Sequence, residues 1–257
     1  MFPPFLFPFL RPVPAAPDPR GGILALSAPP WSAPSRRTED MSAEGQLGIF
    51  LDRYLYSRLE EAGRIRSFRR VRDRSGQLRG TDVILTAPEG GALRLDEKAQ
   101  LYYLNRDLPT FAFELLFLRQ GCLAPGWLCR EGLDTDRYLL VWPFARRDRP
   151  KGIRWTDFTR VDCLLLDKAA LLAWLSGQGL ARERLLREAA DLRRAGERRR
   201  DIPGLPDAYY VASDPARYGE APVNLVIRRA RLLSLPGGAG AAAPLLSRPS
   251  HRLSPML

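Results

Sequence analysis

Two acidic residues and a lysine in the first half of the chain have the spacing of a hydrolytic metal site. Asp96 and Lys98 are two residues apart, and Asp82 precedes them in the segment GTDVILTA. Side chains two apart on a β-strand point to the same face. Two neighbouring carboxylates raise each other's pKa unless a cation neutralises them. Mg²⁺ binds one or two carboxylates, keeps several waters and accepts phosphate oxygens. These residue types therefore predict metal-assisted hydrolysis of a phosphate ester.

Two strands joined by a turn must position these side chains. The segments GTDVILTA and ALRLDEKAQ are rich in strand-forming residues, and APEGG between them has the composition of a turn. With the turn centred at Glu89 or Gly90, Asp82 falls opposite Asp96 or Lys98. Residues opposite one another in an antiparallel pair share a face, with β-carbons about 4.5 to 5.5 Å apart. The hairpin therefore predicts that the three side chains converge.

Glu97 does not fit this simple pattern, because it would face the opposite, apolar side of the hairpin. That side carries Val83, Leu85, Leu93 and Leu95. A carboxylate is expensive to bury among apolar residues. Either the strand ends or bulges at Glu97, or the predicted register is wrong by one residue.

The segment GTDVILTAPEGGALRLDEK, residues 80–98, resembles the PD-(D/E)XK phosphodiesterase superfamily, which has the restriction-endonuclease-like fold. The shared pattern is a helix bearing an acidic residue, a strand bearing an Asp, a turn, and a strand bearing (D/E)-x-K. The resemblance covers roughly residues 42–145. One departure is Thr81, which replaces the proline before Asp82.

The resemblance implies a role for each matching residue. Asp82 matches the first metal ligand, Asp96 the second carboxylate and Lys98 the catalytic lysine. The implied cofactor is Mg²⁺ or Mn²⁺, which would activate a water for in-line attack on a phosphodiester. Lys98 would orient or help deprotonate that water, or stabilise negative charge in the transition state.

The resemblance also implies further metal ligands, at positions that match the family's pattern less completely. The backbone carbonyl of Glu97 is a possible additional metal ligand. Glu44, on the preceding helix, matches the acidic residue of the family's first helix, and Asp52 is its competitor.

The composition excludes several reaction classes. The chain has a single histidine, His251, in a Pro/Ser/Arg-rich tail where nothing would position it. Ser-His-Asp hydrolysis, Cys-His proteolysis and HExxH metalloproteolysis all need an ordered imidazole. The three cysteines fit neither a zinc knuckle nor a disulfide framework, and indicate core residues in a reducing cytoplasm.

The net charge is +11, but all except three of the 40 basic residues are arginine. In a chain also rich in Ala, Gly and Pro, this bias is typical of a GC-rich genome. It is therefore weak evidence for a nucleic-acid partner. No apolar run approaches the roughly 18 to 20 residues that span a bilayer, so we expect no membrane association and a cytoplasmic location.

The length of 257 residues suits one sizeable core. We expect an α/β (α+β) fold with a central mixed β-sheet flanked by helices, a restriction-endonuclease-like core and a helical C-terminal addition. The expected organisation is a disordered Pro-rich extension (1–40) before a functional start at Met41, a nuclease-like domain (41–235) with its core at 42–145 and the helical addition at 155–235, and a disordered tail (236–257).

Apolar patterning predicts further elements. TFAFELLFLRQG, after Pro109, indicates a buried strand or a buried helix, and residues 138–145 indicate a strand. Residues 167–200 predict two helices, the second ending in the basic run ERRR. Residues 221–235 predict a strand or a strand followed by a helix. Glu114, inside the first apolar run, is expected to pair with an arginine rather than to serve the site.

The favoured function is Mg²⁺-dependent hydrolysis of a nucleic acid, with DNA as the expected substrate. The alternative is a non-catalytic nucleic-acid-binding or accessory protein of the same fold, from a mobile element. A third hypothesis is a protein-interaction module that uses the helices of residues 167–200. Tyr102, Tyr103 and Asn105 could stack on bases or belong to the core. Arg193 to Arg200 could follow a phosphate backbone or end a solvated helix.

Overall fold

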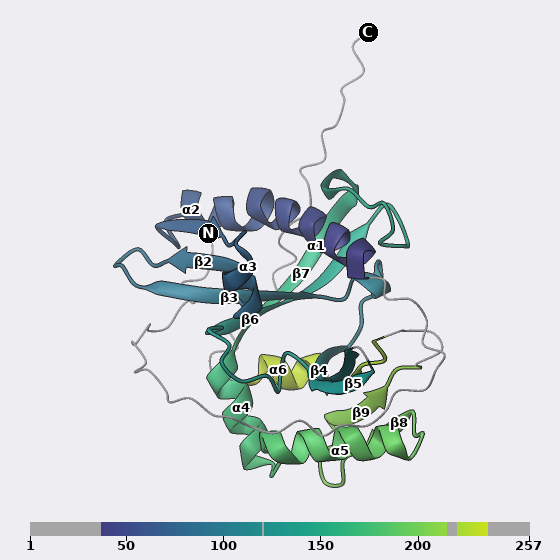
Figure 1. Cartoon of the computed structure of the whole chain (residues 1–257). Helices are drawn as coiled ribbons and strands as arrows, with labels where there is room; N and C mark the ends of the chain where they lie inside the picture. Colours follow the sequence, from purple (N-terminus) through teal and green to yellow (C-terminus); the bar gives the residue numbers. More distant parts are fainter. Residues whose placement is uncertain (1–36, 120, 215–219, 236–257) are drawn as a thin grey trace.

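The computed structural model describes residues 37–119, 121–214 and 220–235. These residues form two five-stranded sheets with helices on their outer sides (Figure 1). The mixed α/β composition agrees with the predicted class. The single central sheet of the prediction is replaced by two.

The first sheet is mixed and has the strand order β1-β2-β3-β6-β7. Its strands are antiparallel to their neighbours, except that β3 and β6 are parallel. The strands are β1 (Ser67–Arg70), β2 (Val83–Thr86), β3 (Ala92–Ala99), β6 (Arg137–Ala145) and β7 (Phe158–Asp167).

The second sheet is antiparallel throughout and has the order β5-β4-β10-β9-β8. Its first two strands occupy the connection between β3 and β6 of the first sheet. The strands are β4 (Thr110–Arg119), β5 (Cys122–Pro125), β8 (Arg199–Asp201), β9 (Ala208–Ala212) and β10 (Val223–Arg228). The apolar run after Pro109 is therefore a strand, as is the run at residues 138–145.

Helices cover the outer sides of the two sheets. In Figure 1, α1 and α2 extend along the upper side of the first sheet, and α5 lies below the second sheet. A π-helical turn, Asp52–Tyr56, joins α1 to α2. The α-helices are α1 (Arg37–Leu51), α2 (Ser57–Glu61), α3 (Arg74–Leu78), α4 (Lys168–Gly177), α5 (Arg182–Arg194) and α6 (Arg229–Leu233), and two 3₁₀ turns cover Leu101–Tyr103 and Trp155–Asp157.

Strand β6 contributes to both hydrophobic cores. Its residues Leu139 and Val141 join the core beneath α1, whereas Tyr138, Leu140 and Trp142 join the core shared with the second sheet, α4 and α5. A strand that is buried on both faces needs apolar residues at successive positions. This double burial explains the continuous apolar sequence of β6.

The predicted hairpin is confirmed. Val83 pairs with Leu95 and Leu85 with Leu93, which centres the turn on Glu89. Gly90 and Gly91 have φ values of +95° and +91°, a backbone region that L side chains rarely adopt. The glycines of the turn therefore fix which residues of β2 and β3 pair with each other.

The C-terminal region differs from the predicted helical addition. Residues 155–235 contain α4, α5 and α6, but also β7, β8, β9 and β10. The predicted second helix ends at Arg194 instead of in the run ERRR, because Gly196 has a φ of +68° and the chain then enters β8. Residues 221–235 form a strand followed by a helix.

The terminal predictions fall mostly outside the described residues, which exclude 1–36 and 236–257. Helix α1 already begins at Arg37, before the predicted start at Met41. Within the described ranges, no helix has the length and apolar character needed to cross a bilayer.

Candidate active site

Asp82 immediately precedes β2, and its carboxylate lies close to that of Asp96 on β3. Val83 pairs with Leu95, and the Asp82 backbone N–H also donates to Leu95 O at 2.8 Å. The Asp82 Oδ2 atom accepts a hydrogen bond of 2.8 Å from the backbone N–H of Glu97. This bond holds the Asp82 carboxylate against β3, beside Asp96.

Asp96 is the most deeply buried acidic group of the site. Its side chain is 3% exposed, and Oδ1 lies 2.6 Å from Lys98 Nζ. The other carboxylate oxygen, Oδ2, is buried and accepts no hydrogen bond from the described residues. Burial raises the pKa of Asp96 to about 7; the Lys98 charge opposes this rise, and the Asp82 charge adds to it. An unsatisfied buried carboxylate oxygen is costly unless a cation or donor meets it.

Lys98 remains protonated in this setting. Burial acts to lower its pKa, but the charges of Asp96 and Asp82 outweigh burial and raise the pKa above its ordinary value. The ammonium group therefore suits charge stabilisation better than deprotonation of a water. Of the roles considered from the sequence, the structure favours the electrostatic one.

Glu97 faces the apolar side as the predicted register requires, and β3 neither ends nor bulges there. Its carboxylate accepts hydrogen bonds from the Tyr56 hydroxyl at 2.7 Å and from Arg70 at 2.8 and 3.1 Å. Burial raises the pKa of Glu97, and Arg70 opposes the rise. A long-range ion pair, which the sequence pattern does not reveal, makes this carboxylate tolerable.

The two helix acids occupy different places. Asp52 pairs with Arg70 at 2.7 Å and so belongs to the Glu97 network. Glu44 lies on α1, and its charge helps to raise the pKa of Lys98. The structure therefore brings Glu44, rather than its competitor, within electrostatic range of the predicted site.

The second sheet and its neighbours add residues that the sequence did not assign to the site. The Lys98 ammonium lies 5.2 Å from the Trp127 ring centroid. Burial raises the pKa of Glu114 on β4 to about 7, and Lys98 and the Trp127 backbone N–H oppose this rise. Among the described residues, the charged groups that shift the pKa of Glu114 are Lys98 and Glu220, and the expected arginine is not one of them.

Two further residues surround Asp96. Tyr138 pairs with Asp96 across β3 and β6, and its buried hydroxyl has no hydrogen-bond partner among the described residues. Lys168 lies at the start of α4 and donates to Leu133 O at 3.3 Å. The Asp96 charge acts to raise the pKa of Lys168, against the larger, lowering effect of burial. The sequence did not indicate that Tyr138 lies at the site, because this residue is part of a continuous apolar strand.

The site carries an excess of negative charge. Glu44, Asp82, Asp96 and Glu114 interact with Lys98 or Lys168, Glu220 acts on Glu114, and Asp134 and Asp136 act on Lys168. The described residues contain no group of three His, Cys, Asp or Glu side chains arranged to hold a metal. A cation here would therefore depend on Asp82 and Asp96 together with water, which suits Mg²⁺.

The other candidates from the sequence lie elsewhere or have structural roles. Tyr102 and Tyr103 are 44% and 51% exposed after the end of β3. Asn105 has a φ of +63°, and its side chain bonds the backbone of Ala145 and of Arg147. Asn105 therefore stabilises a loop.

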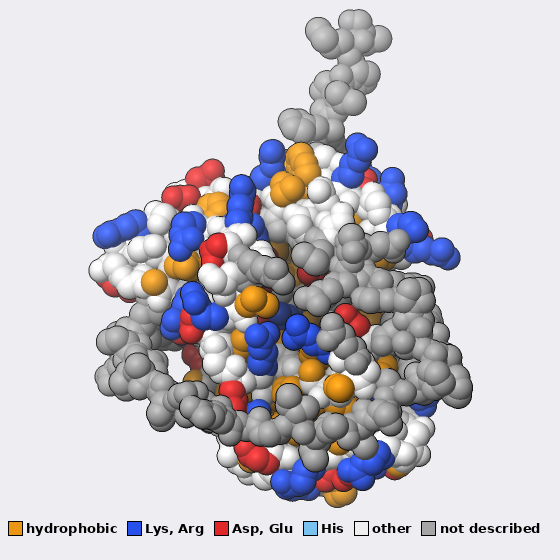
Figure 2. Space-filling model, in the orientation of Figure 1, with side chains coloured by type: hydrophobic (Ala, Val, Ile, Leu, Met, Phe, Trp, Pro, Cys, Tyr) orange, Lys and Arg blue, Asp and Glu red, His pale blue; other side chains and the backbone are white. Residues whose placement is uncertain are grey.

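The basic stretch at residues 193–200 is extensively ion-paired. The pairs are Arg194–Asp191, Arg198–Asp214, Arg199–Asp201, and Arg200 with Glu188 and Glu197. On the face drawn in Figure 2, Lys and Arg side chains alternate with Asp and Glu over the described surface. These contacts favour an ion-paired helix end and an edge strand over a phosphate track.

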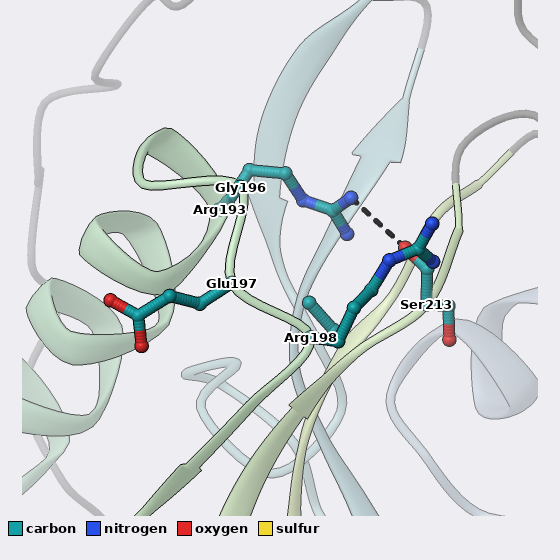
Figure 3. A pocket seen from close by; sticks show the side chains of 6 residues that line it. Arg193, Gly196, Glu197, Arg198 and Ser213 are labelled. Atoms are coloured by element: carbon teal, nitrogen blue, oxygen red, sulfur yellow. Dashed lines mark hydrogen bonds between the residues drawn. The ribbon is translucent and has the colours of Figure 1, made fainter.

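A cavity of about 200 Å³ lies near the end of α5, apart from the carboxylate site (Figure 3). It is lined by Arg193, Gly196, Glu197, Arg198, Ala212 and Ser213. Arg193 donates to the backbone carbonyls of Ser213 and Ala221, and Arg198 pairs with Asp214. The arginines of this cavity thus hold neighbouring loops together.

Comparisons with models of protein families, with curated proteins and with solved structures gave no match. The functional argument therefore rests on the chemistry of the site.

Proposed function

We propose that this protein hydrolyses phosphodiester bonds of a nucleic acid, with DNA as the substrate, in a Mg²⁺-dependent reaction at Asp82, Asp96 and Lys98. One observation carries the proposal. The buried Asp96 carboxylate has an oxygen with no hydrogen-bond partner among the described residues, lies close to the Asp82 carboxylate and is followed on the same face of β3 by Lys98.

The donor set fits a hard divalent cation. Asp82 and Asp96 would hold Mg²⁺, and the Glu97 backbone carbonyl is a further candidate ligand. When bound, the metal would activate a water and neutralise phosphate charge. It would also offset the mutual repulsion of the two carboxylates and the burial of Asp96.

The chain's own residues would orient the reactants. Protonated Lys98 would attract a phosphate oxygen and stabilise the negative charge that develops during in-line attack. Asp82 is held in place by the Glu97 backbone N–H, so its carboxylate is preorganised. The Glu97–Arg70 ion pair fixes the opposite face of β3.

The arrangement also supports the resemblance to the PD-(D/E)XK superfamily. A helix with Glu44, Asp82 immediately before the first hairpin strand and a D-x-K strand occur in the expected order, on a mixed sheet. We propose a restriction-endonuclease-like core on this basis, with β4 and β5 inserted between β3 and β6.

The test uses the full chain and isothermal titration with Mg²⁺ or Mn²⁺, followed by cleavage of labelled DNA. Asp82→Asn and Asp96→Asn should each lose metal binding and cleavage together. Asp191→Asn, which removes an exposed carboxylate on α5, is the matched control and should keep both. Undiminished cleavage by Asp96→Asn would refute the proposal.

A non-catalytic nucleic-acid-binding protein of the same fold is the second candidate. The observation that favours it is the 2.6 Å contact between Lys98 and Asp96, because a lysine can neutralise a degenerate site without metal. This candidate predicts DNA binding that falls steeply with salt and is unaffected by chelator or by Asp82→Asn.

A further inference from the structure

Lys98 lies next to an aromatic surface as well as to Asp96. Its ammonium is 5.2 Å from the centroid of the Trp127 ring, within the range of a cation–π interaction. The indole packs edge-on against Tyr138, with centroids 5.0 Å apart, and at a tilt against Phe113, with centroids 5.3 Å apart. These contacts from both sheets fix the ring beside the lysine.

A carboxylate of the second sheet is held at the same place. The Leu128 backbone N–H donates to Glu114 O at 3.1 Å, and the Trp127 backbone N–H lowers the pKa of the Glu114 carboxylate, so Trp127 lies beside both the carboxylate and the lysine. Gly126 permits this approach, because a Cβ there would lie 2.5 Å from Glu114 O and 2.6 Å from Glu114 Cγ. Any larger residue at Gly126 would push β4 away from the Trp127 backbone.

Metal binding at Asp96 conflicts with the present position of Lys98. Its Nζ atom lies 2.6 Å from Asp96 Oδ1, and a divalent cation on that carboxylate would repel the ammonium. A lysine side chain is long and has several rotatable bonds, so it can move without a backbone change. It then needs another anionic partner, because an unpaired ammonium in a largely buried site is costly. Glu44 and Glu114 both interact with Lys98, and Glu114 is the one that lies beside the indole that Lys98 already contacts.

We propose that Glu114 is a positioning residue that receives the Lys98 ammonium, beside Trp127, when a divalent cation binds at Asp82 and Asp96. The inference rests on the proposed function and deepens it. Lys98 has one position with Asp96 in the metal-free protein and another with Glu114 in the metal-bound protein. The working site is complete only when both sheets contribute.

The chain has only three lysines, Lys98, Lys151 and Lys168, so selective ¹³Cε labelling of lysine gives a spectrum that can be followed directly. Lys98→Met assigns the Lys98 signal. Mg²⁺ is then titrated into the wild-type full chain, Glu114→Gln and Glu188→Gln. The last variant removes an ion-paired glutamate of α5 and is the charge-matched control.

The expected result is a displacement of the Lys98 signal by Mg²⁺ in the wild type and in Glu188→Gln. In Glu114→Gln the displacement should be lost, and the Mg²⁺ affinity should fall about tenfold, because one negative charge near the site is missing. A second measurement needs no variant. The nuclear Overhauser effect between the Lys98 ε-protons and the Trp127 ring should strengthen when Mg²⁺ is added.

The failures are distinguishable. If Glu114→Gln binds Mg²⁺ and shifts the Lys98 signal as the wild type does, the positioning role is overturned and the proposed metal site survives. If wild-type protein binds no Mg²⁺, the proposed function fails and this inference fails with it. If Glu114→Gln does not fold, the nuclear Overhauser effect between Lys98 and Trp127 in the wild-type protein tests the positioning role instead. An effect that Mg²⁺ leaves unchanged overturns that role.

Discussion

At the scale of single residues, charge and burial oppose each other around Asp96. The carboxylate is 3% exposed, next to a lysine and close to the Asp82 carboxylate. Burial raises the pKa of Asp96 to about 7, and the neighbouring carboxylates keep Lys98 charged. Each group therefore has the protonation behaviour of a functional site more than that of a solvated strand face.

Removing the Lys98 charge should separate metal binding from catalysis. Lys98→Met should lower the rate of DNA cleavage by at least about 100-fold, because the transition-state charge loses its partner. Mg²⁺ affinity should rise, since no ammonium competes for Asp96. Single-turnover cleavage and calorimetry on the same protein measure both effects. Lys151→Met is the control, and cleavage at the wild-type rate by Lys98→Met would contradict the assigned role.

Glu114 should make the metal-free protein less stable as the pH rises. Burial is the larger influence and raises its pKa to about 7 from the ordinary 4.5, with Lys98 opposing. A raised pKa means that the folded state holds the proton more tightly than the unfolded state does. The stabilising contribution is therefore complete below about pH 4.5 and is lost as the pH rises through 7.

Glu114→Gln cannot ionise and should escape this loss. Relative to wild type, its free energy of unfolding should increase by about 1 to 3 kcal/mol between pH 4.5 and pH 8, after discounting for partial exposure. Urea denaturation at the two pH values, without metal, measures the difference. A constant difference between the variants would show that Glu114 does not titrate in this range.

At the scale of elements, strand β3 is fixed from both faces. One face carries Asp96 and Lys98, and the other carries Glu97, which joins Arg70, Tyr56 and the π-helical turn after α1. Gly48 allows Arg70 to approach α1, since a Cβ there would lie 3.0 Å from Arg70 Cζ. Helix α1 and the turn after it therefore support β3 on the face opposite Asp96 and Lys98.

Breaking this network should be strongly destabilising. Arg70→Met leaves Glu97 and Asp52 without their cation and should lower the free energy of unfolding by about 3 to 5 kcal/mol. Chemical denaturation measures the loss. The double variant Arg70→Met/Glu97→Gln should recover part of it, because the buried charge is also removed. Additive losses in the double variant would mean that the two side chains are not coupled.

At the scale of the whole molecule, β6 joins the two hydrophobic cores. Its alternate residues enter the core beneath α1 and the core between the sheets. Neither core can be lost without exposing one face of β6. The described part of the chain should therefore unfold as one cooperative unit.

Two tryptophans report on this cooperativity. Trp142 lies in the core between the sheets, and Trp155 packs against the core beneath α1. The fluorescence transitions of variants that retain one reporter or the other, made by Trp→Phe changes elsewhere, should coincide with the circular dichroism transition in urea. Midpoints that differ between the two reporters would indicate two independent units.

The convergence of Asp82, Asp96 and Lys98 could be predicted from sequence because it depends on local rules. Strand alternation has a period of two, and the Gly-containing turn fixes which residues face each other. The same rules put Glu97 on the apolar side, but the strand end, bulge or register error expected from that placement is wrong, because β3 continues through Glu97. They could not supply its partner, because Arg70 and Tyr56 come from other elements.

The sequence by itself therefore determined the mixed α/β class, the hairpin and the shared face of the three predicted site residues. Only the tertiary structure decided the division into two sheets, the parallel pairing of β3 with β6, and the place of Glu114 and Trp127 beside Lys98. The physical reason is the distance along the chain over which each kind of interaction acts. Periodicity and turn chemistry act between near neighbours in the chain, whereas sheet assembly and ion pairing depend on contacts between segments that only packing brings together.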